Sequence, residues 1–385
     1  MMKRQAAQLP LHGGKAPRWL FERMTKLAGA VTMAIVDEYG PSEMLRRLSD
    51  PWWFQAFGCV LGFDWHSSGV TTVTCGALKS AYQQLGPDLG IVVAGGKGAT
   101  GRKTPAEIEA AATRFSISGG DKLIYASRMS AKVDSAAIQD GYQIYQHAFF
   151  FTPRGDWCVV QQGMNERSSW ARRYHWLGEH VDDFVCEPHA AIQNLSDIDS
   201  DDAADRLPLL NMVASEAEES RTVSASLACE NPDRLLAEID RLTEGPTLFA
   251  PARHRIIDQD VNLRSLRTVL VRAHERQPQN FETLLGTAGV GPAAVRSLAL
   301  LAEIVHGVPM SRRDPGESES GNGDCSTRRW ADFAYAHGGK DGHPFPVDRT
   351  LYDRNIEVLS SAVRRARLGE TEKRDAWRRL AGRSS

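Results

Sequence analysis

Two β-forming runs separated by a short turn constrain the fold of this chain most strongly. The runs QIYQHAFFF and WCVVQQGM flank residues 152–156, where a proline and a glycine supply turn geometry. The apolar run GIVVAGGKG predicts a buried strand followed by a loop. Helical patterns at residues 18–38, 42–48 and 104–114 accompany these strands. The first half therefore predicts a mixed α+β domain that contains a β-hairpin.

The second half of the chain has a different pattern from the first, because an acidic segment is followed by a series of helical patterns. The acidic segment LSDIDSDDAAD has few apolar residues and predicts a linker or a solvated loop. Helical patterns follow at residues 208–219, 232–243, 261–275, 280–285, 292–306 and 349–367. We therefore expect an α+β substrate-recognition domain at 1–194, a linker at 195–207 and an all-α domain at 208–385. The polar, glycine-rich run SRRDPGESESGNGDCS predicts a surface excursion within the last of these.

Composition excludes several classes of protein. The formal net charge of -2 over 385 residues favours no particular partner. The sequence contains no run of eighteen apolar residues, so no membrane-spanning helix is predicted. The six cysteines form no Cys-x-x-Cys pair, which argues against a zinc or iron–sulfur site and predicts free thiols in a reducing compartment. We expect a cytoplasmic protein with no membrane partner, no metal and no cofactor.

A glycine turn between two helical patterns is the clearest binding feature, at residues 280–307. Gly289 and Gly291 permit a sharp turn, Pro292 suits the first turn of the second helix, and Val290 can plug between the helices. Unpaired N–H groups at the start of that helix, together with its dipole, predict an anion site. The alternative is an ordinary helix–loop–helix corner closed by a glycine C-cap.

A Val-Asp step further along the chain adds a candidate catalytic residue. In HPFPVDRTLYDRNIEVLSSAV, Asp348 occupies the N-cap position of a predicted helix, a place that aspartate also favours for purely structural reasons. Together the two features resemble the helix-hairpin-helix DNA glycosylase superfamily. The resemblance implies double-stranded DNA as partner, phosphate binding by Gly289, Val290 and Gly291, and catalysis by Asp348. That carboxylate would stabilise an oxocarbenium-like transition state or activate water, after the target base is flipped out.

The same resemblance restricts the reaction. Bifunctional members of the superfamily carry a nucleophilic lysine two positions after the second glycine, where this chain has Ala293. A monofunctional enzyme without a Schiff-base step is therefore implied. The gap between Gly291 and Asp348 is longer than in the superfamily, because a polar excursion and the HGGKDGH segment intervene.

Polar side chains concentrate around the predicted hairpin of the first half. Amides and aromatic rings in this set predict a pocket that reads and stacks on a base. A rival hypothesis makes Asp134 and Asp140 the metal ligands of a nuclease, although no Asp…Glu-x-Lys pattern accompanies them. A polar strand face with capping aspartates is the structural alternative. The candidate base-recognition residues are Gln139, Tyr142, His147, Gln161, Gln162 and Asn165.

Two basic segments are further candidates for contact with DNA. Arg172 and Arg173 lie in ARRYHW, where cations alternate with aromatics as in grooves that track a nucleic-acid strand. A helix with a snorkelling arginine face is the alternative. Lys97 lies in GGKGATGRK, which lacks the G-x-x-x-x-G-K-[ST] spacing of a phosphate loop and instead predicts a basic loop against a phosphate backbone.

The chain as a whole resembles a family of uncharacterised prokaryotic proteins, through segments such as HGGKAPRWL, WHSSGVTTVTCGALK and DSAAIQDGYQIYQHAFFF. That resemblance carries no activity with it. From the helix-hairpin-helix resemblance we expect a monofunctional DNA glycosylase that excises a damaged or modified base. The large first half extends this expectation to a bulky base, such as a modified base in foreign DNA. The alternatives are the metal-dependent nuclease centred on Asp134 and Asp140, and a non-catalytic protein that binds DNA structure.

Overall fold

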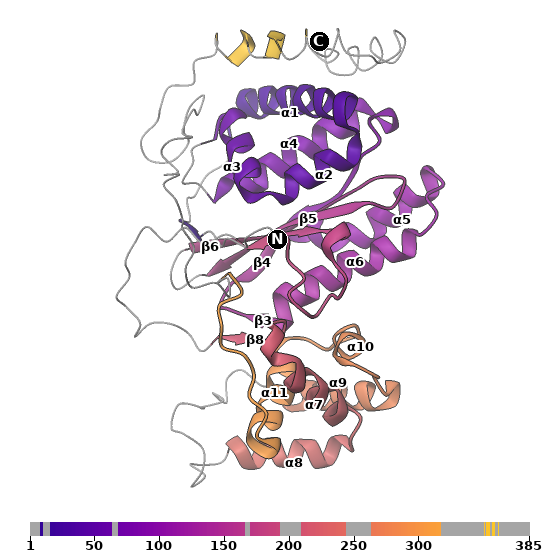
Figure 1. The fold of residues 1–385 in the computed structure, drawn as a ribbon, viewed down its shortest axis with the longest axis vertical. Coiled ribbons are helices and arrows are strands. Elements are labelled where there is room, and N and C mark those ends of the chain that lie inside the picture. The colour runs from indigo at the N-terminus through magenta and orange to yellow at the C-terminus, as the bar shows by residue number, and fades with distance from the viewer. Residues whose placement is uncertain are drawn as a thin grey trace.

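The computed structural model describes residues 8–10, 16–63, 68–165, 170–192, 209–243 and 263–316, together with 350, 352–354, 356–358 and 361. These residues form an α+β fold, as expected, in which an antiparallel sheet lies between two groups of helices (Figure 1). Among the described helices, none has the length and apolar character needed to cross a membrane.

The sheet is built around the predicted hairpin. Strands β4 (Gln143–Phe151) and β5 (Trp157–Asn165) pair from Phe151↔Trp157 to Gln143↔Met164, and the turn falls at the predicted residues 152–156. The path of the sheet is β1-β6-β5-β4-β2, with β7 pairing on β6. The remaining strands of this sheet are β1 (Gln8–Pro10), β2 (Val92–Lys97), β6 (Trp170–Leu177) and β7 (Ala191–Ile192).

One face of the sheet is covered by the N-terminal helices. Phe150 and Val160 point from the strands into a core formed with α1 (Arg18–Tyr39), α2 (Pro41–Ser49), α3 (Pro51–Val60) and α4 (Gly69–Leu85). The side chain of Tyr352 is fully buried in this core, and its hydroxyl donates to the carbonyl of Leu61 at 2.7 Å. The described residues near position 352 therefore belong to the N-terminal layer (Figure 1).

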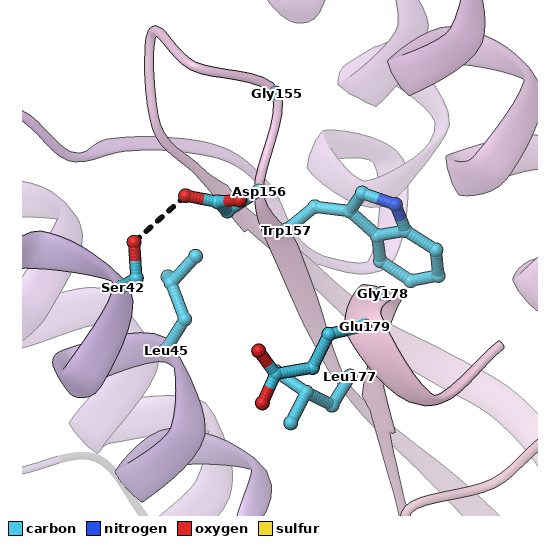
Figure 2. A pocket seen from close by; sticks show the side chains of 8 residues that line it. All are labelled: Ser42, Leu45, Gly155, Asp156, Trp157, Leu177, Gly178 and Glu179. Carbon is cyan, nitrogen blue, oxygen red and sulfur yellow. Dashed lines mark hydrogen bonds between the residues drawn. The ribbon is translucent and has the colours of Figure 1, made fainter.

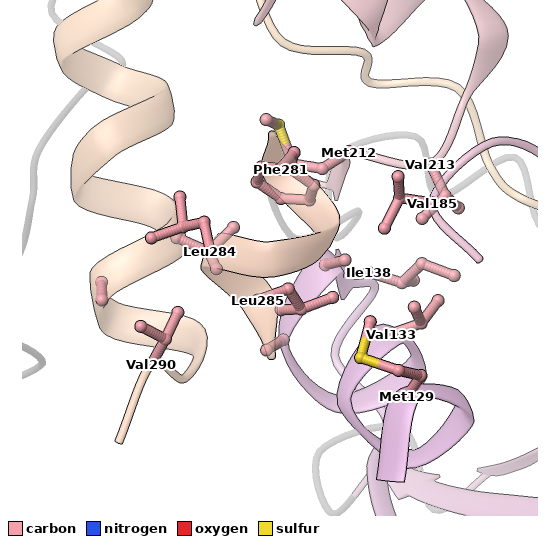
Figure 3. Packing of buried hydrophobic residues seen from close by; sticks show 14 of the residues in the cluster. Met129, Val133, Ile138, Val185, Met212, Val213, Phe281, Leu284, Leu285 and Val290 are labelled. Carbon is pink, nitrogen blue, oxygen red and sulfur yellow. The ribbon is translucent and has the colours of Figure 1, made fainter. Parts of the chain in front are cut away.

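The other face carries both first-half and second-half helices. Helix α5 (Thr104–Arg114), helix α6 (Gly120–Lys132) and a π-helical turn, Val133–Ala137, lie against the sheet. Beyond them pack α7 (Glu218–Ala228), α8 (Pro232–Thr243), α9 (Leu263–Arg276), α10 (Phe281–Leu285) and α11 (Pro292–His306). A single hydrophobic cluster contains both Phe149 of the sheet and Val290 of the second half, so the two halves share this core. Figure 3 shows the part of it where Val133 and Ile138 lie close to Leu285.

The predicted helix at 208–219 is wrong. Strand β8 (Leu210–Asn211) pairs there with β3 (Ile138–Gln139), and α7 begins only at Glu218. The Arg221 guanidinium explains the extended backbone, because it donates to the carbonyls of Met212 and Ala214 at 2.8 and 2.7 Å. The second half is thus not purely helical, since its short strand joins the first half.

The prediction of free thiols is confirmed for five cysteines, Cys59, Cys75, Cys158, Cys186 and Cys229. Cys325 and the predicted linker at 195–207 lie outside the described residues.

Candidate functional site

The predicted turn at 288–291 is a compact hairpin between α10 and α11. Asn280 opens α10 with a capping box, in which its side chain accepts from the Thr283 N–H at 2.8 Å. Gly289 has φ +90°, and Val290 is only 4% exposed between the helices, as predicted. Gly291 is the N-cap of α11, where no side chain caps the helix. Ala288 and Gly289 are exposed, so the tip of the hairpin presents its backbone to solvent.

Lys132 of α6 supports this hairpin from the first half of the chain. Its Nζ donates to the carbonyl oxygens of Leu285 at 2.5 Å, Thr287 at 2.7 Å and Val290 at 3.2 Å. Burial, aided by the positive charge of Arg276, lowers the pKa of Lys132 to about 8. The ammonium group therefore places a positive charge beneath a loop whose carbonyls would otherwise repel an anion.

Further cations surround the hairpin. A Cβ atom at Gly289 would lie 3.4 Å from Nη1 of Arg272, so this exposed guanidinium borders the glycine turn. Arg276 is also exposed, one helical turn further along α9. Within the described part of the chain, neither arginine forms an ion pair with a carboxylate. The hairpin thus combines exposed backbone with cations from α6 and α9, while its own helix α10 carries the carboxylate of Glu282, which accepts from the Tyr125 hydroxyl.

Gln139 joins the hairpin to the polar cluster predicted in the first half. Its Nε2 donates to the carbonyl of Pro292 at 2.9 Å, and its Oε1 accepts from Nε of Arg296 at 2.8 Å. Ala293 is half-buried in the same first turn of α11. Of the predicted base-recognition residues, Gln139 is the one that contacts the hairpin through these bonds.

A buried chain of hydrogen bonds holds Asp134, His147 and Gln161. His147 Nδ1 lies 2.8 Å from Gln161 Oε1, an acceptor, so Nδ1 carries the proton and Ser127 donates to Nε2 at 2.9 Å. Burial lowers the pKa of His147 to about 4, which keeps the ring neutral. The Gln161 amide donates to Asp134 Oδ2 at 2.5 Å. These three side chains are enclosed by protein, with exposures of 0 to 6%, so they do not form an open base pocket.

Asp140 lies in a second buried network, with Arg172. One oxygen of Asp140 accepts from Arg172 Nη1 and from the Tyr174 hydroxyl, both at 2.8 Å. Arg172 also donates to Asp314 at 2.8 Å, and its guanidinium stacks over Tyr142 at 4.8 Å. Burial raises the pKa of Asp140 despite the adjacent arginine. Among the residues that the structure describes, no three His, Cys, Asp or Glu side chains gather as metal ligands.

The prediction that Arg172 and Arg173 track a DNA strand is wrong. ARRYHW is the inner strand β6 rather than a helix, and the two arginines are 1% and 0% exposed. Arg173 donates to Thr71 and to Gln55, both at 2.8 Å, on the face of the sheet opposite Arg172. Burial lowers the pKa of Arg173 to about 10. Both guanidinium groups therefore form hydrogen bonds inside the protein and are not exposed for contact with DNA.

The remaining predicted residues are scattered. Gln162 is buried and donates to the carbonyl of Ser68 at 2.9 Å, so it is not available to read a base. Asn165 is half-buried at the end of β5. Lys97 is exposed, with Nζ 5.6 Å from the centre of the Tyr145 ring, but it lies at the end of strand β2, opposite Gln146 of β4, and not in a loop as predicted. Asp348 lies outside the described residues.

A separate hollow lies beside the β4–β5 turn (Figure 2). It measures about 210 Å³ and lies between α2 and the β4–β5 turn. Its carboxylates are held by neighbouring side chains, since Asp156 accepts from Ser42 at 2.7 Å and Glu179 pairs with Arg46 at 2.7 Å. None of the predicted site residues lines it.

Sequence reasoning missed Lys132, Arg272, Arg276 and His189. The first three lie on helices with ordinary amphipathic patterns, so only the packing of α6 and α9 against the hairpin reveals them. His189 Nε2 lies 2.5 Å from Asp134 Oδ1, and no local motif connects residues 55 positions apart. Local sequence gave no signal for any of the four.

Comparison with known proteins supplies a family. The sequence profile of a family described as "Protein of unknown function (DUF763)" matches residues 5–347. No curated protein and no solved structure matches the chain. Because the match covers most of the 385 residues, this chain belongs to the DUF763 family.

Proposed function

We propose that this protein binds the phosphate backbone of double-stranded DNA through the hairpin at residues 280–307. The observation that carries the proposal is the exposed turn at Gly289, bordered by Arg272 and supported from beneath by the Lys132 ammonium. Exposed backbone N–H groups at the start of a helix favour an anion, and the helix dipole adds to this preference.

The charge distribution fits such a ligand better than the net charge of the whole chain does. The formal charge of -2 would not attract a polyanion, but Lys132, Arg272 and Arg276 place three cations around the hairpin, against the one carboxylate of Glu282 on α10. Contacts of this kind neutralise phosphates without reading bases, so binding should be independent of sequence and sensitive to salt.

We further propose that the bound DNA is a substrate for monofunctional base excision. Ala293 offers no amine in the first turn of α11, and the Lys132 amine is engaged by three carbonyl oxygens. Among the described residues around the hairpin, these positions supply no available nucleophilic lysine, which favours attack by water over a Schiff-base route.

Fluorescence anisotropy with a labelled random-sequence duplex tests the binding step. We expect Kd to be similar for unrelated sequences and to rise steeply with salt. Sequence-selective binding, or binding that ignores salt, would contradict phosphate recognition by the hairpin. Lys26→Gln is a suitable control, because this exposed lysine lies on α1, across the sheet from the hairpin.

A further inference from the structure

A narrow cleft opens beside β8, where the first and second halves of the chain meet. Its volume of about 10 Å³ is enough for the centre of one water molecule. The lining is mostly polar and comes from three segments distant in sequence. The residues are Glu187, His189, Asn211, Val213, Arg313, Asp314 and Pro315.

His189 is held in this cleft by a buried carboxylate. Its Nε2 lies 2.5 Å from Oδ1 of Asp134, and its ring centre lies 4.5 Å from that of Trp176. The other oxygen of Asp134 accepts from Gln161 at 2.5 Å and from the Trp176 indole at 2.9 Å. Three N–H donors thus surround Asp134, which sits on the π-helical turn that follows α6. Such turns occur often at functional sites.

The remaining ring nitrogen of His189 is the chemically available one. When Nε2 donates to Asp134, Nδ1 of the neutral ring carries a lone pair. Within the described residues, Nδ1 has no hydrogen-bond partner, and although the His189 side chain is only 2% exposed, it lines the cleft. The other polar groups of the cleft are already occupied. Asn211 bonds the carbonyl of Arg313 at 3.0 Å, and Arg313 pairs with Glu187 at 2.5 Å.

The cleft and the hairpin are connected through adjacent residues of the chain. Gln139 donates to Pro292 at the hairpin, whereas its neighbour Asp140 pairs with Arg172, which in turn pairs with Asp314 of the cleft. Across the β3–β8 pair, Ile138 faces Asn211 of the cleft. A duplex on the hairpin would therefore lie beside the strand pair that also builds the cleft.

We propose that His189, oriented by Asp134, is the general base of a hydrolytic site that cleaves an N-glycosidic bond in the DNA held by the hairpin. The proposal rests on the proposed DNA-binding function. A water in the cleft gives a proton to Nδ1, and its oxygen forms a bond to C1′ of a sugar at the mouth. The C1′–N bond breaks with its electron pair going to the base, which takes a proton from solvent. His189 then returns its own proton to solvent.

The charges of the cleft favour this bond over a phosphodiester. The carboxylates of Glu187 and Asp314 line the cleft with the single cation of Arg313, so these three side chains sum to a charge of about -1. Carboxylates stabilise the positive charge that develops on a sugar ring as its glycosidic bond breaks. The same carboxylates oppose the approach of a phosphate to the attacking water.

Release of free bases provides the test. Plasmid DNA is methylated with dimethyl sulfate, deaminated with nitrous acid or prepared with glucosylated 5-hydroxymethylcytosine, and bases released by the full-length protein are measured by mass spectrometry. We expect His189→Ala to lower the rate of release about 100-fold or more, the usual contribution of a general base. His180→Gln is the matched control, since this histidine is exposed outside the cleft.

Chemical rescue separates a catalytic role from a structural one. Added imidazole should restore base release by His189→Ala, because it can occupy the space of the missing ring. Wild-type protein that binds DNA but releases no base overturns the proposal, and so does His189→Ala that works at the wild-type rate. The two claims fail separately, because anisotropy tests the hairpin and base release tests His189.

Discussion

The ammonium nitrogen of Lys132 lies 2.7 Å from the carbonyl oxygen of Thr287, across 155 positions of the sequence. A residue at the end of α6 thereby supports the loop between α10 and α11. The carbonyls of Leu285 and Val290 complete the same contact. The proposed DNA-binding hairpin therefore depends on the first half of the chain for its shape and for part of its charge.

Replacing Lys132 tests this support. Lys132→Met keeps the aliphatic stem but leaves three half-buried carbonyls without their donor, so we expect a loss of about 2–3 kcal/mol in the free energy of unfolding. Urea denaturation measures the loss. Lys122→Met, at the exposed start of α6, should change stability by less than about 0.5 kcal/mol. Equal effects of the two substitutions would show that the carbonyl contacts contribute little.

The two glycines of the hairpin should respond differently to alanine. Gly289 has φ +90°, where a Cβ atom is strained, and that atom would also meet Arg272 and Val269 at 3.4 Å. Gly291 has φ -141° and its Cβ would have only one neighbour, at 3.9 Å. We expect Gly289→Ala to cost about 1–2 kcal/mol and Gly291→Ala to cost much less. The reverse order in thermal or urea unfolding would contradict this backbone geometry.

His147 should make the fold sensitive to acid. Burial lowers its pKa from 6.5 to about 4 in the folded protein, so the unfolded chain takes up a proton first as the pH falls. The unfolded state then binds more protons between these values, and stability is lost over that window. From pH 7 to pH 4 we expect His147 to account for a loss of about 3 kcal/mol.

His147→Gln checks the assignment, because glutamine does not titrate. The variant should lose about 3 kcal/mol less than wild type when urea unfolding is compared at pH 7 and pH 4. If the variant lost as much stability as wild type between pH 7 and pH 4, titratable groups other than His147 would account for the loss.

Local patterns predicted the elements whose periodicity is strong. The β4–β5 hairpin, α5, α8 and α11 fall where alternation, Pro signals or helical spacing put them. Helices α3 and α4 were missed because PWWFQAFGCV is apolar on nearly every side and GVTTVTCG is rich in β-branched residues and glycine. Tertiary burial decides such segments, and a single sequence does not display it.

The site was less predictable than the fold. The glycine hairpin is local, so its turn and its buried Val290 followed from sequence. The roles of Arg172 and Arg173 did not, because alternation of charge and aromatics looks the same on a surface strand and on an inner strand whose arginines are paired. His189 and Asp134 meet only through the fold.

The salt dependence of DNA binding by the double variant Arg272→Gln/Arg276→Gln tests the central claim most directly. Anisotropy titrations at several salt concentrations would compare it with wild type and with Lys26→Gln. If the hairpin binds phosphates, the affinity of the double variant for DNA should be lower by about 10-fold or more at low salt. The slope of log K plotted against log salt concentration should be shallower by about 2, one for each lost contact. Wild-type and double-variant proteins with the same affinity and the same slope would contradict DNA binding by this hairpin.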